Sequence, residues 1–164
     1  MRGTSMAILD TGPIWELVLY SAVKQLGFAN LEGDLTYFVR PEVYQNCGDF
    51  LSTFAGKTTS ASVVVELYGR IQRTQPKKGH PDLWELVYEE FRRMSMDEDI
   101  VKLLDMELDL VAKFGPTDVS LLEIARRNMT QAPVILTVDR EFHARCKKEE
   151  VSSELRIEVC NPIY

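Results

Sequence analysis

Four acidic residues stand where apolar runs of the sequence end or a helical pattern begins, namely Asp10, Glu66, Asp118 and Asp139. A carboxylate at such a position loses hydration free energy unless a partner stabilises its charge. In an open α/β sheet the carboxyl ends of neighbouring strands meet at one crevice, where ligands bind. Four carboxylates in that crevice would repel one another unless a hard divalent cation such as Mg²⁺ or Mn²⁺ held them. The pattern therefore predicts a metal-dependent enzyme acting on phosphodiesters, with all four acids within reach of one ion.

Each of the four acids also has a purely structural explanation. An aspartate at the start of a helix stabilises that start, which suits Asp10, Asp118 and Asp139. Glu66 would lie near the N-terminus of a helix, where the macrodipole stabilises its charge. Four such acids in order along one α/β chain favour a shared site over four unrelated helix starts.

Strand and helix signals alternate along the chain. Strand-like runs cover 6–10, 35–40, 134–138 and 155–159, while 58–62 is extended or turning. Helical patterns cover 14–26, 41 to about 55, 63–71, 83–93, 97–114, 117 to about 129 and 140–150. Residues 75–81, with two prolines and a glycine, predict a loop. Strands separated by helices predict a parallel sheet with right-handed crossovers.

The composition is that of an ordinary folded domain, since the 164-residue chain is 45% hydrophobic and 27% charged. This length predicts one domain over residues 1–164, with residues 1–5 as an unstructured leader. No stretch approaches the roughly 18 consecutive apolar residues that cross a bilayer. The apolar run 6–9 is too short for the core of a signal peptide. We therefore expect a cytoplasmic protein with no membrane association.

Cysteine, histidine and charge content exclude some classes of site. The cysteines Cys47, Cys146 and Cys160 are odd in number and widely spaced, so neither a disulfide framework nor a thiolate zinc site is expected. His80 and His143 lack a partner at metal-ligand spacing. The net charge of −6 argues against a protein that coats nucleic acid by charge alone. This negative charge does not exclude a nuclease, because the carboxylates clustered in a metal site themselves contribute to it.

The order of the four acids and their local contexts resemble the PIN domain family. The matching segments are 8–13 (ILDTGP), 60–67 (SASVVVEL), 117–125 (TDVSLLEIA) and 135–142 (ILTVDREF), and they extend over nearly the whole chain. The resemblance implies a three-layer α/β/α sandwich with a central, mostly parallel sheet. It also implies a Mg²⁺- or Mn²⁺-dependent ribonuclease, and many members of the family are VapC-like toxins of toxin–antitoxin pairs. The chain is longer than a compact toxin around 31–56 and 75–81, so it departs from the toxin pattern in length while it keeps the four acidic segments of the nuclease pattern.

The resemblance carries roles over to this sequence by position. The catalytic and metal-binding quartet would be Asp10, Glu66, Asp118 and Asp139. Three further residues would act beside it or on substrate: Thr11, Thr137, which matches a frequent hydroxyl next to the last acid, and Arg140, which could contact a phosphate. We expect hydrolysis of an RNA phosphodiester by metal-activated water, with RNA as the substrate and a protein antitoxin as a possible partner.

Three other classes of protein compete with this interpretation. A non-catalytic PIN-like scaffold would have the fold but act through protein or RNA binding. The tripeptide Asp10-Thr11-Gly12 is also the signature of retropepsin-like proteases, but those are all-β proteins and this chain is rich in helix. A phosphatase of the haloacid dehalogenase type needs a second aspartate where this chain has Gly12. The intact acidic quartet favours the nuclease.

The predicted helices over 83–93 and 97–114 carry more large apolar residues than one narrow stripe requires. Surplus apolar surface on a small domain often marks an interface. The alternative is that both helices simply cover one face of the sheet. Since PIN-like proteins commonly form dimers, we expect a symmetric homodimer that leaves the acidic crevices open.

Overall fold

The computed structural model of the protein describes residues 5–26, 40–73 and 83–161. Within these residues the strands are β1 (Met6–Leu9), β2 (Gly56–Ser60), β3 (Asp97–Asp99), β4 (Val134–Thr137) and β5 (Arg156–Val159). They form one sheet in the order β3-β2-β1-β4-β5, in which every neighbouring pair is parallel. The expected parallel sheet is confirmed.

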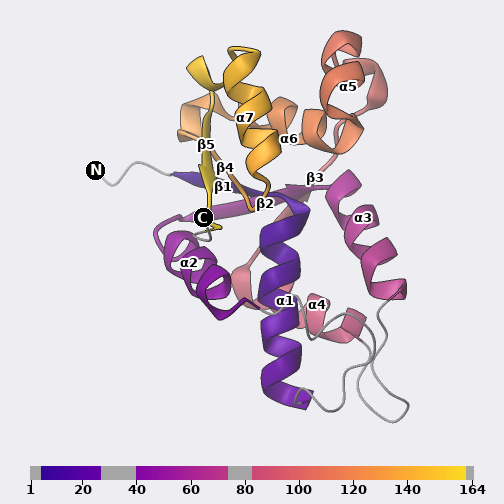
Figure 1. Cartoon of the computed structure of the whole chain (residues 1–164), viewed down its shortest axis with the longest axis vertical. Coiled ribbons are helices and arrows are strands. Elements are labelled where there is room, and N and C mark those ends of the chain that lie inside the picture. Colours follow the sequence, from indigo (N-terminus) through magenta and orange to yellow (C-terminus); the bar gives the residue numbers. More distant parts are fainter. Residues whose placement is uncertain (1–4, 27–39, 74–82, 162–164) are drawn as a thin grey trace.

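Helices cover both faces of this sheet. The α-helices are α1 (Thr11–Leu26), α2 (Pro41–Leu51), α3 (Ala61–Gln72), α4 (Leu83–Met94), α5 (Leu108–Phe114), α6 (Pro116–Arg127) and α7 (Arg140–Lys148). Figure 1 shows α5, α6 and α7 on one side of the sheet and α1, α2 and α4 on the other. Helix α3 packs against both α1 and α6, and so lies where the two layers meet. The three-layer α/β/α sandwich is therefore also confirmed.

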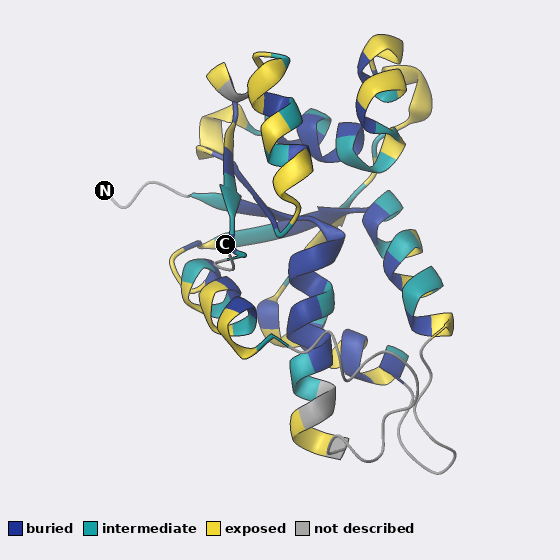
Figure 2. Cartoon of the chain, in the orientation of Figure 1, coloured by how far each residue is buried: buried dark blue, intermediate teal, exposed yellow. Residues whose placement is uncertain are grey.

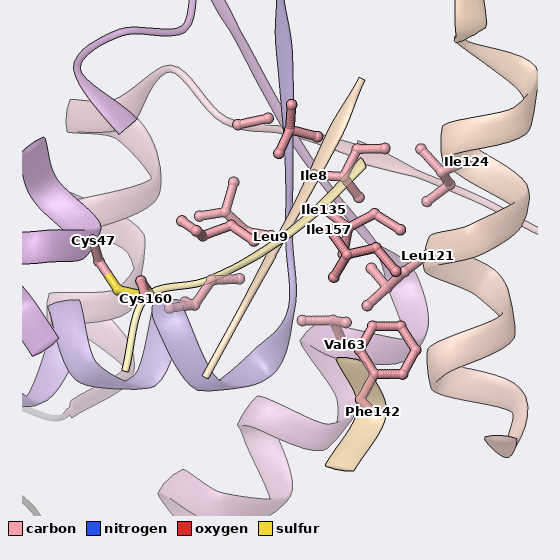
Figure 3. Close-up of a cluster of buried hydrophobic side chains, with 14 of the residues drawn as sticks. Ile8, Leu9, Cys47, Val63, Leu121, Ile124, Ile135, Phe142, Ile157 and Cys160 are labelled. Atoms are coloured by element: carbon pink, nitrogen blue, oxygen red, sulfur yellow. A yellow bond between two sulfur atoms is a disulfide. The ribbon is translucent and has the colours of Figure 1, made fainter. Parts of the chain in front are cut away.

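Strands β1 and β4 form the apolar centre of the sheet. Ile8, Leu9, Ile135 and Leu136 are completely buried, because helices cover both faces of the sheet at this point (Figure 2). Figure 3 shows Phe142 packed with side chains of the same core cluster that come from α3, α6 and β4. Two apolar runs of the sequence, 6–9 and 134–136, thus become the two strands at the centre of the sheet.

Strand β2 is buried although its sequence is polar. Thr58, Thr59 and Ser60 are almost inaccessible to solvent. Their hydroxyls are bonded within the fold, since Thr59 Oγ1 donates to the carbonyl of Leu9 at 2.7 Å and Thr58 Oγ1 to the carbonyl of Asp97 at 3.1 Å. The sequence pattern indicated only an extended or turning segment here, because a strand without apolar residues gives no periodic signal.

The predicted single helix over 97–114 is wrong. Residues Asp97–Asp99 instead form β3, which pairs with β2 at the edge of the sheet. The short 3₁₀ turn η3 (Leu103–Asp105) and helix α5 follow. The break divides the apolar stripe, so that Leu110 and Phe114 are buried while other large apolar side chains are exposed, namely Ile100, Leu103, Leu104 and Leu108.

Several element boundaries also differ from those expected. Helix α2 ends at Leu51, and Gly56 begins β2 rather than closing that helix. Helix α1 already begins at Thr11, directly after β1. The cap of α6 is Gly115, so Thr117 lies inside the helix and is not its cap. The backbone of Gly115, with φ +89°, makes the reversal between α5 and α6 in a region that other residues rarely adopt.

A disulfide joins Cys47 of α2 to Cys160, the residue after β5 (Figure 3). The two Cα atoms are 5.6 Å apart although 113 positions separate the residues in the sequence. The expectation of no disulfide framework, drawn from the number and spacing of the cysteines, is thereby corrected. Spacing along the chain could not reveal the pair, because it depends on α2 returning to the carboxyl edge of the sheet.

Some predictions fall outside the described residues. These are the strand over 35–40, apart from its last residue, the loop over 75–81, and residues 1–4 of the leader. Among the residues that are described, no helix has the length and apolarity needed to cross a bilayer.

Candidate functional site

The pairing of β1 with β4 brings two of the predicted site residues together. Leu9 lies opposite Leu136 in the parallel register, so Asp10 and Thr137 follow side by side at the carboxyl edge. Thr137 Oγ1 donates to Asp10 Oδ2 at 2.7 Å and accepts from the backbone N–H of Asp139 at 2.9 Å. The backbone N–H of Thr11 donates to the other carboxylate oxygen of Asp10 at 2.6 Å. Asp10 is therefore held from both sides.

The first turn of α1 leaves no room for a side chain at Gly12 unless Val138 moves. A Cβ atom at Gly12 would lie 2.1 Å from Cγ2 of Val138, the residue between Thr137 and Asp139. The start of α1 thus lies directly against the end of β4. This close approach explains the glycine in the run Asp10-Thr11-Gly12 without reference to the retropepsin signature.

Asp139 caps helix α7, as its structural explanation predicted. Its Oδ1 accepts from the backbone N–H groups of Glu141 at 2.7 Å and Phe142 at 3.0 Å. This arrangement satisfies two amide groups at the helix start. The side chain of Arg140, the next residue, donates to the carbonyl of Asn161 at 3.0 Å. The predicted contact of Arg140 with a phosphate stays a prediction.

Asp118 enters the site from the first turn of α6. Its side chain is 19% exposed, and its Oδ2 atom lies 3.4 Å from Nη2 of Arg145 on α7. The start of α6 is tied to the start of α3, because the hydroxyls of Ser120 and Ser60 are 2.7 Å apart and both residues are buried. Ser60 also caps α3 by accepting from the N–H of Val63 at 3.2 Å.

Glu66 lies on α3 and is the most accessible of the predicted helix-borne acids. Its side chain is 40% exposed and forms an ion pair with Arg70 at 2.8 Å. Beside it is a cavity of about 390 Å³ between α3 and the start of α6, lined by Ala61, Ser62, Val65, Glu66, Pro116 and Thr117. The helix-borne side of the site therefore opens onto a space that a substrate group could enter.

The charges of the four acids act on one another. Burial, together with the charges of Asp10, Asp139 and Glu66, raises the pKa of Asp118 to about 7 against the lowering effect of Arg145. Burial also raises the pKa of Asp10, with added effects of Glu66 and Asp139, while its bonds from Thr137 and Thr11 lower it. The fold thus brings the four carboxylates, distant in sequence, into mutual electrostatic range.

The donor chemistry of the site suits Mg²⁺ or Mn²⁺, because all its candidate ligands are oxygen atoms. Thr11 adds a hydroxyl that is buried beside Asp10 and has no hydrogen-bond partner. As the side chains are arranged, however, no three Asp, Glu, His or Cys residues in the described part of the chain are grouped closely enough to hold an ion. The four acids are instead turned toward Thr137, Arg70, Arg145 and the start of α7, so a common ion would require some of these side chains to rotate.

Sequence reasoning missed Arg145, Ser60 and Ser120. Arg145 belongs to the basic residues at 140–148, but only the packing of α7 against α5 and α6 distinguishes it from its neighbours. Ser60 lies three residues before the helical pattern over 63–71, and its role as a cap became visible only when the structure placed the start of α3 at Ala61. Comparison of the sequence with known proteins finds no matching family model and no matching curated protein.

Proposed function

We propose that the protein is a metal-dependent endoribonuclease that hydrolyses RNA phosphodiester bonds. The observation that carries this proposal is the gathering of the four carboxylates at one place. Thr137 links Asp10 to Asp139 through two hydrogen bonds, and burial together with the charges of the other three acids raises the pKa of Asp118. Perturbed carboxylates gathered at one place are typical of functional sites. The position of this cluster at the carboxyl edge of a parallel sheet agrees with where α/β proteins bind ligands.

Each residue of the cluster has a distinct part in the proposal. Asp10 and Asp118 would bind the cation most directly, and Glu66 and Asp139 would bind it through water or hold a second ion. When bound, Mg²⁺ or Mn²⁺ supplies an activated water and stabilises negative charge at the phosphate. Thr137 fixes the orientation of the Asp10 carboxylate by donating to it at 2.7 Å.

A cleavage assay tests the proposal. The purified protein is incubated with structured RNA in Mn²⁺, in Mg²⁺ and in EDTA, beside the variant Asp10→Asn prepared in the same way. Cleavage that needs the metal and is lost in the variant supports a nuclease. Cleavage that persists in Asp10→Asn at the wild-type rate would reject a catalytic role for Asp10, and absence of cleavage by the wild type in both metals would reject the proposal.

A second candidate is a PIN-like scaffold that acts through binding alone. It is favoured by the observation that the four carboxylates are already bonded within the protein, for example Glu66 to Arg70 and Asp118 to Arg145. Calorimetry with Mn²⁺ separates the two candidates. A nuclease binds the ion and loses this binding in Asp10→Asn, whereas the scaffold binds no ion in either form.

A toxin role, a protein antitoxin and a homodimer are further parts of the proposal. Ile100, Leu103, Leu104 and Leu108 are all more than half exposed around η3 and α5, which gives an apolar surface that a second copy or an antitoxin could cover. Light scattering at micromolar concentration tests the dimer, and a mass near 18.8 kDa would reject it. A small neighbouring reading frame, coexpressed with this one, tests the antitoxin by copurification.

A cytoplasmic location is also proposed. The disulfide between Cys47 and Cys160 argues against it, since such bonds persist mainly in oxidising compartments. Cells lysed with a thiol-trapping reagent provide the test. If both cysteines are labelled, the bond is reduced inside the cell, and if neither is labelled, a reducing location is rejected.

A further inference from the structure

One arginine from α7 reaches into the acidic cluster, and it is not the one that the sequence indicated. Nη1 of Arg145 donates to the carbonyl of Lys113 at the end of α5, at 3.1 Å. Its Nη2 lies 3.4 Å from Oδ2 of Asp118 in the first turn of α6. Arg145 therefore bridges the junction of α5 and α6 at the point where Asp118 enters the site.

The packing around Arg145 holds its guanidinium in place. The guanidinium carbon lies 5.5 Å from the ring centre of Phe114, a distance at which a cation is attracted to an aromatic face. Phe114 in turn makes an edge contact with Phe142 on α7, at 6.1 Å between ring centres. The side chain as a whole is 41% exposed, so its charge remains close to solvent.

The donors of Arg145 are only partly used. Nε is buried and has no hydrogen-bond partner. Nε and Nη2 lie on the same edge of a guanidinium, and together they form the fork that binds two oxygens of a carboxylate or a phosphate. Asp118 makes a single contact at 3.4 Å with this edge, longer than the roughly 2.7–2.9 Å of a strong charge-assisted bond. The fork therefore has one unused donor, but because that donor is buried, an oxyanion must take the place of Asp118 to reach both nitrogen atoms.

We propose that Arg145 is the phosphate-binding arginine of the acidic site and, in the metal-free protein, the counter-ion of Asp118. The inference rests on the proposed ribonuclease function and adds a residue to it. When Asp118 takes a cation as its partner, the Arg145 fork is released beside the cluster. A phosphate of the RNA then supplies the two oxygens that this edge lacks.

Binding measurements without cleavage test the phosphate contact. A fluorescent stem-loop RNA is titrated in Ca²⁺ with wild type, Arg145→Ala and Arg145→Lys, at several salt concentrations. Lys148→Ala is the matched control, since it removes one exposed positive charge from the same helix. Arg145→Ala is expected to weaken binding by about tenfold and to reduce the salt dependence by about one phosphate contact, as loss of a phosphate-binding cation does. Arg145→Lys keeps the charge but lacks the fork, so its RNA affinity should lie between that of the wild type and that of Arg145→Ala.

Metal affinity tests the counter-ion role independently of RNA. Mn²⁺ binding is followed by electron paramagnetic resonance at a pH well above the pKa of Asp118. Removal of a competing cation should tighten Mn²⁺ binding several-fold in Arg145→Ala but not in Lys148→Ala. Unchanged RNA binding in Arg145→Ala would overturn the phosphate role. Weaker binding of both Mn²⁺ and RNA, with a lower melting temperature, would show that Arg145 is only structural.

The outcomes also separate this inference from the function on which it rests. If RNA binding depends on Arg145 but the wild type shows no metal-dependent cleavage, the ribonuclease proposal is rejected. The role of Arg145 as a phosphate contact then stands. If the wild type cleaves RNA but Arg145→Ala changes neither RNA binding nor Mn²⁺ binding, the ribonuclease proposal stands and the proposed role of Arg145 is rejected. If the wild type binds no RNA, both are rejected.

Discussion

The two halves of the acidic site stabilise their charges in different ways. In the strand half, Asp10 and Asp139 accept hydrogen bonds from a threonine hydroxyl and from backbone N–H groups. In the helix half, Glu66 and Asp118 are each paired with an arginine. Residues of the same chemical type thus depend on neutral, fixed donors in one half and on charged side chains in the other.

This difference indicates which half is already organised. Backbone amides cannot turn away without loss of the helix start or the sheet, so the strand half keeps its geometry whether or not a ligand is present. Arginine side chains can exchange one oxyanion for another at little cost in free energy when they are partly exposed. The strand half therefore fixes the position of a ligand, and the helix half adjusts to it.

The largest effect is expected for Asp10→Asn. The amide keeps the shape of Asp10 but removes its charge, so cleavage should fall by about a hundredfold or more, beyond the loss seen for outer partners of a metal ligand. Thermal melting in EDTA should change little, because burial disfavours the charge that is removed. An Asp10→Asn variant that still cleaves RNA at near the wild-type rate would refute the leading role of the strand half.

The next effect is expected for Thr137→Val, which keeps the shape of the side chain and removes one donor to Asp10. The lost bond at 2.7 Å leaves a buried carboxylate oxygen and the N–H of Asp139 without their partner. Stability should fall by about 1–3 kcal/mol, and cleavage by about tenfold. Urea denaturation beside Thr53→Val, whose hydroxyl is exposed and bonds to the carbonyl of Phe50, gives the matched control. Equal losses in the two variants would mean that Thr137 is an ordinary hydroxyl.

The pH dependence of stability should come in part from the helix half. The folded protein raises the pKa of Asp118 from 3.8 to about 7, so between these values it holds a proton more tightly than the unfolded chain does. This contribution is fully present below the unfolded pKa and is lost as the pH rises through the folded one.

In EDTA, the free energy of unfolding should therefore fall by an amount on the order of 1–3 kcal/mol between about pH 5 and pH 8. Asp118→Asn should flatten this decline, although Asp10, whose pKa is also raised, keeps part of it. Denaturation series at fixed ionic strength measure both proteins. A wild-type curve that rises over this range, or one that the variant reproduces, contradicts the expectation.

The smallest effect is expected for the pair of Glu66 and Arg70. Both side chains are more than a third exposed, so Arg70→Met should change stability by less than about 1 kcal/mol. Removal of this partner frees Glu66 to turn toward an ion, and Mn²⁺ binding should tighten slightly. A stability loss as large as that of Thr137→Val would show that the helix half is as fixed as the strand half.

The sequence predicted best the elements that end at the strand half. The apolar runs that became β1 and β4 clearly indicate strands. Asp10 and Asp139 follow these strands closely in the sequence, so their positions at the carboxyl edge follow from the strand assignments. Asp118 was also recognisable as an acid at the start of a helical pattern, whereas Glu66, expected near the N-terminus of a helix, lies midway along α3. Their arginine partners were not, because the contact of Arg145 with Asp118 depends on how α7 packs against α6.

Prediction failed where local pattern and tertiary structure disagree. The periodic apolar residues of 97–114 indicate a helix, yet pairing with β2 draws Asp97–Asp99 into the sheet edge. The polar run Gly56–Ser60 becomes a strand through pairing with β1 and β3, and neighbouring carbonyls accept its threonine hydroxyls. Pairing between strands is non-local, so neither outcome can be read from a short window of sequence.

The bond between Thr137 and Asp10 joins residues that are 127 positions apart in the chain. During translation, β1 leaves the ribosome long before β4, and a nascent chain that stops short of Asp139 contains only part of the site. For the ribonuclease proposed here, this order of synthesis has a protective consequence. A growing chain, still tethered to the ribosome and to the messenger that encodes it, cannot cut that messenger until the last of the four acids has been made and β4 has inserted beside β1.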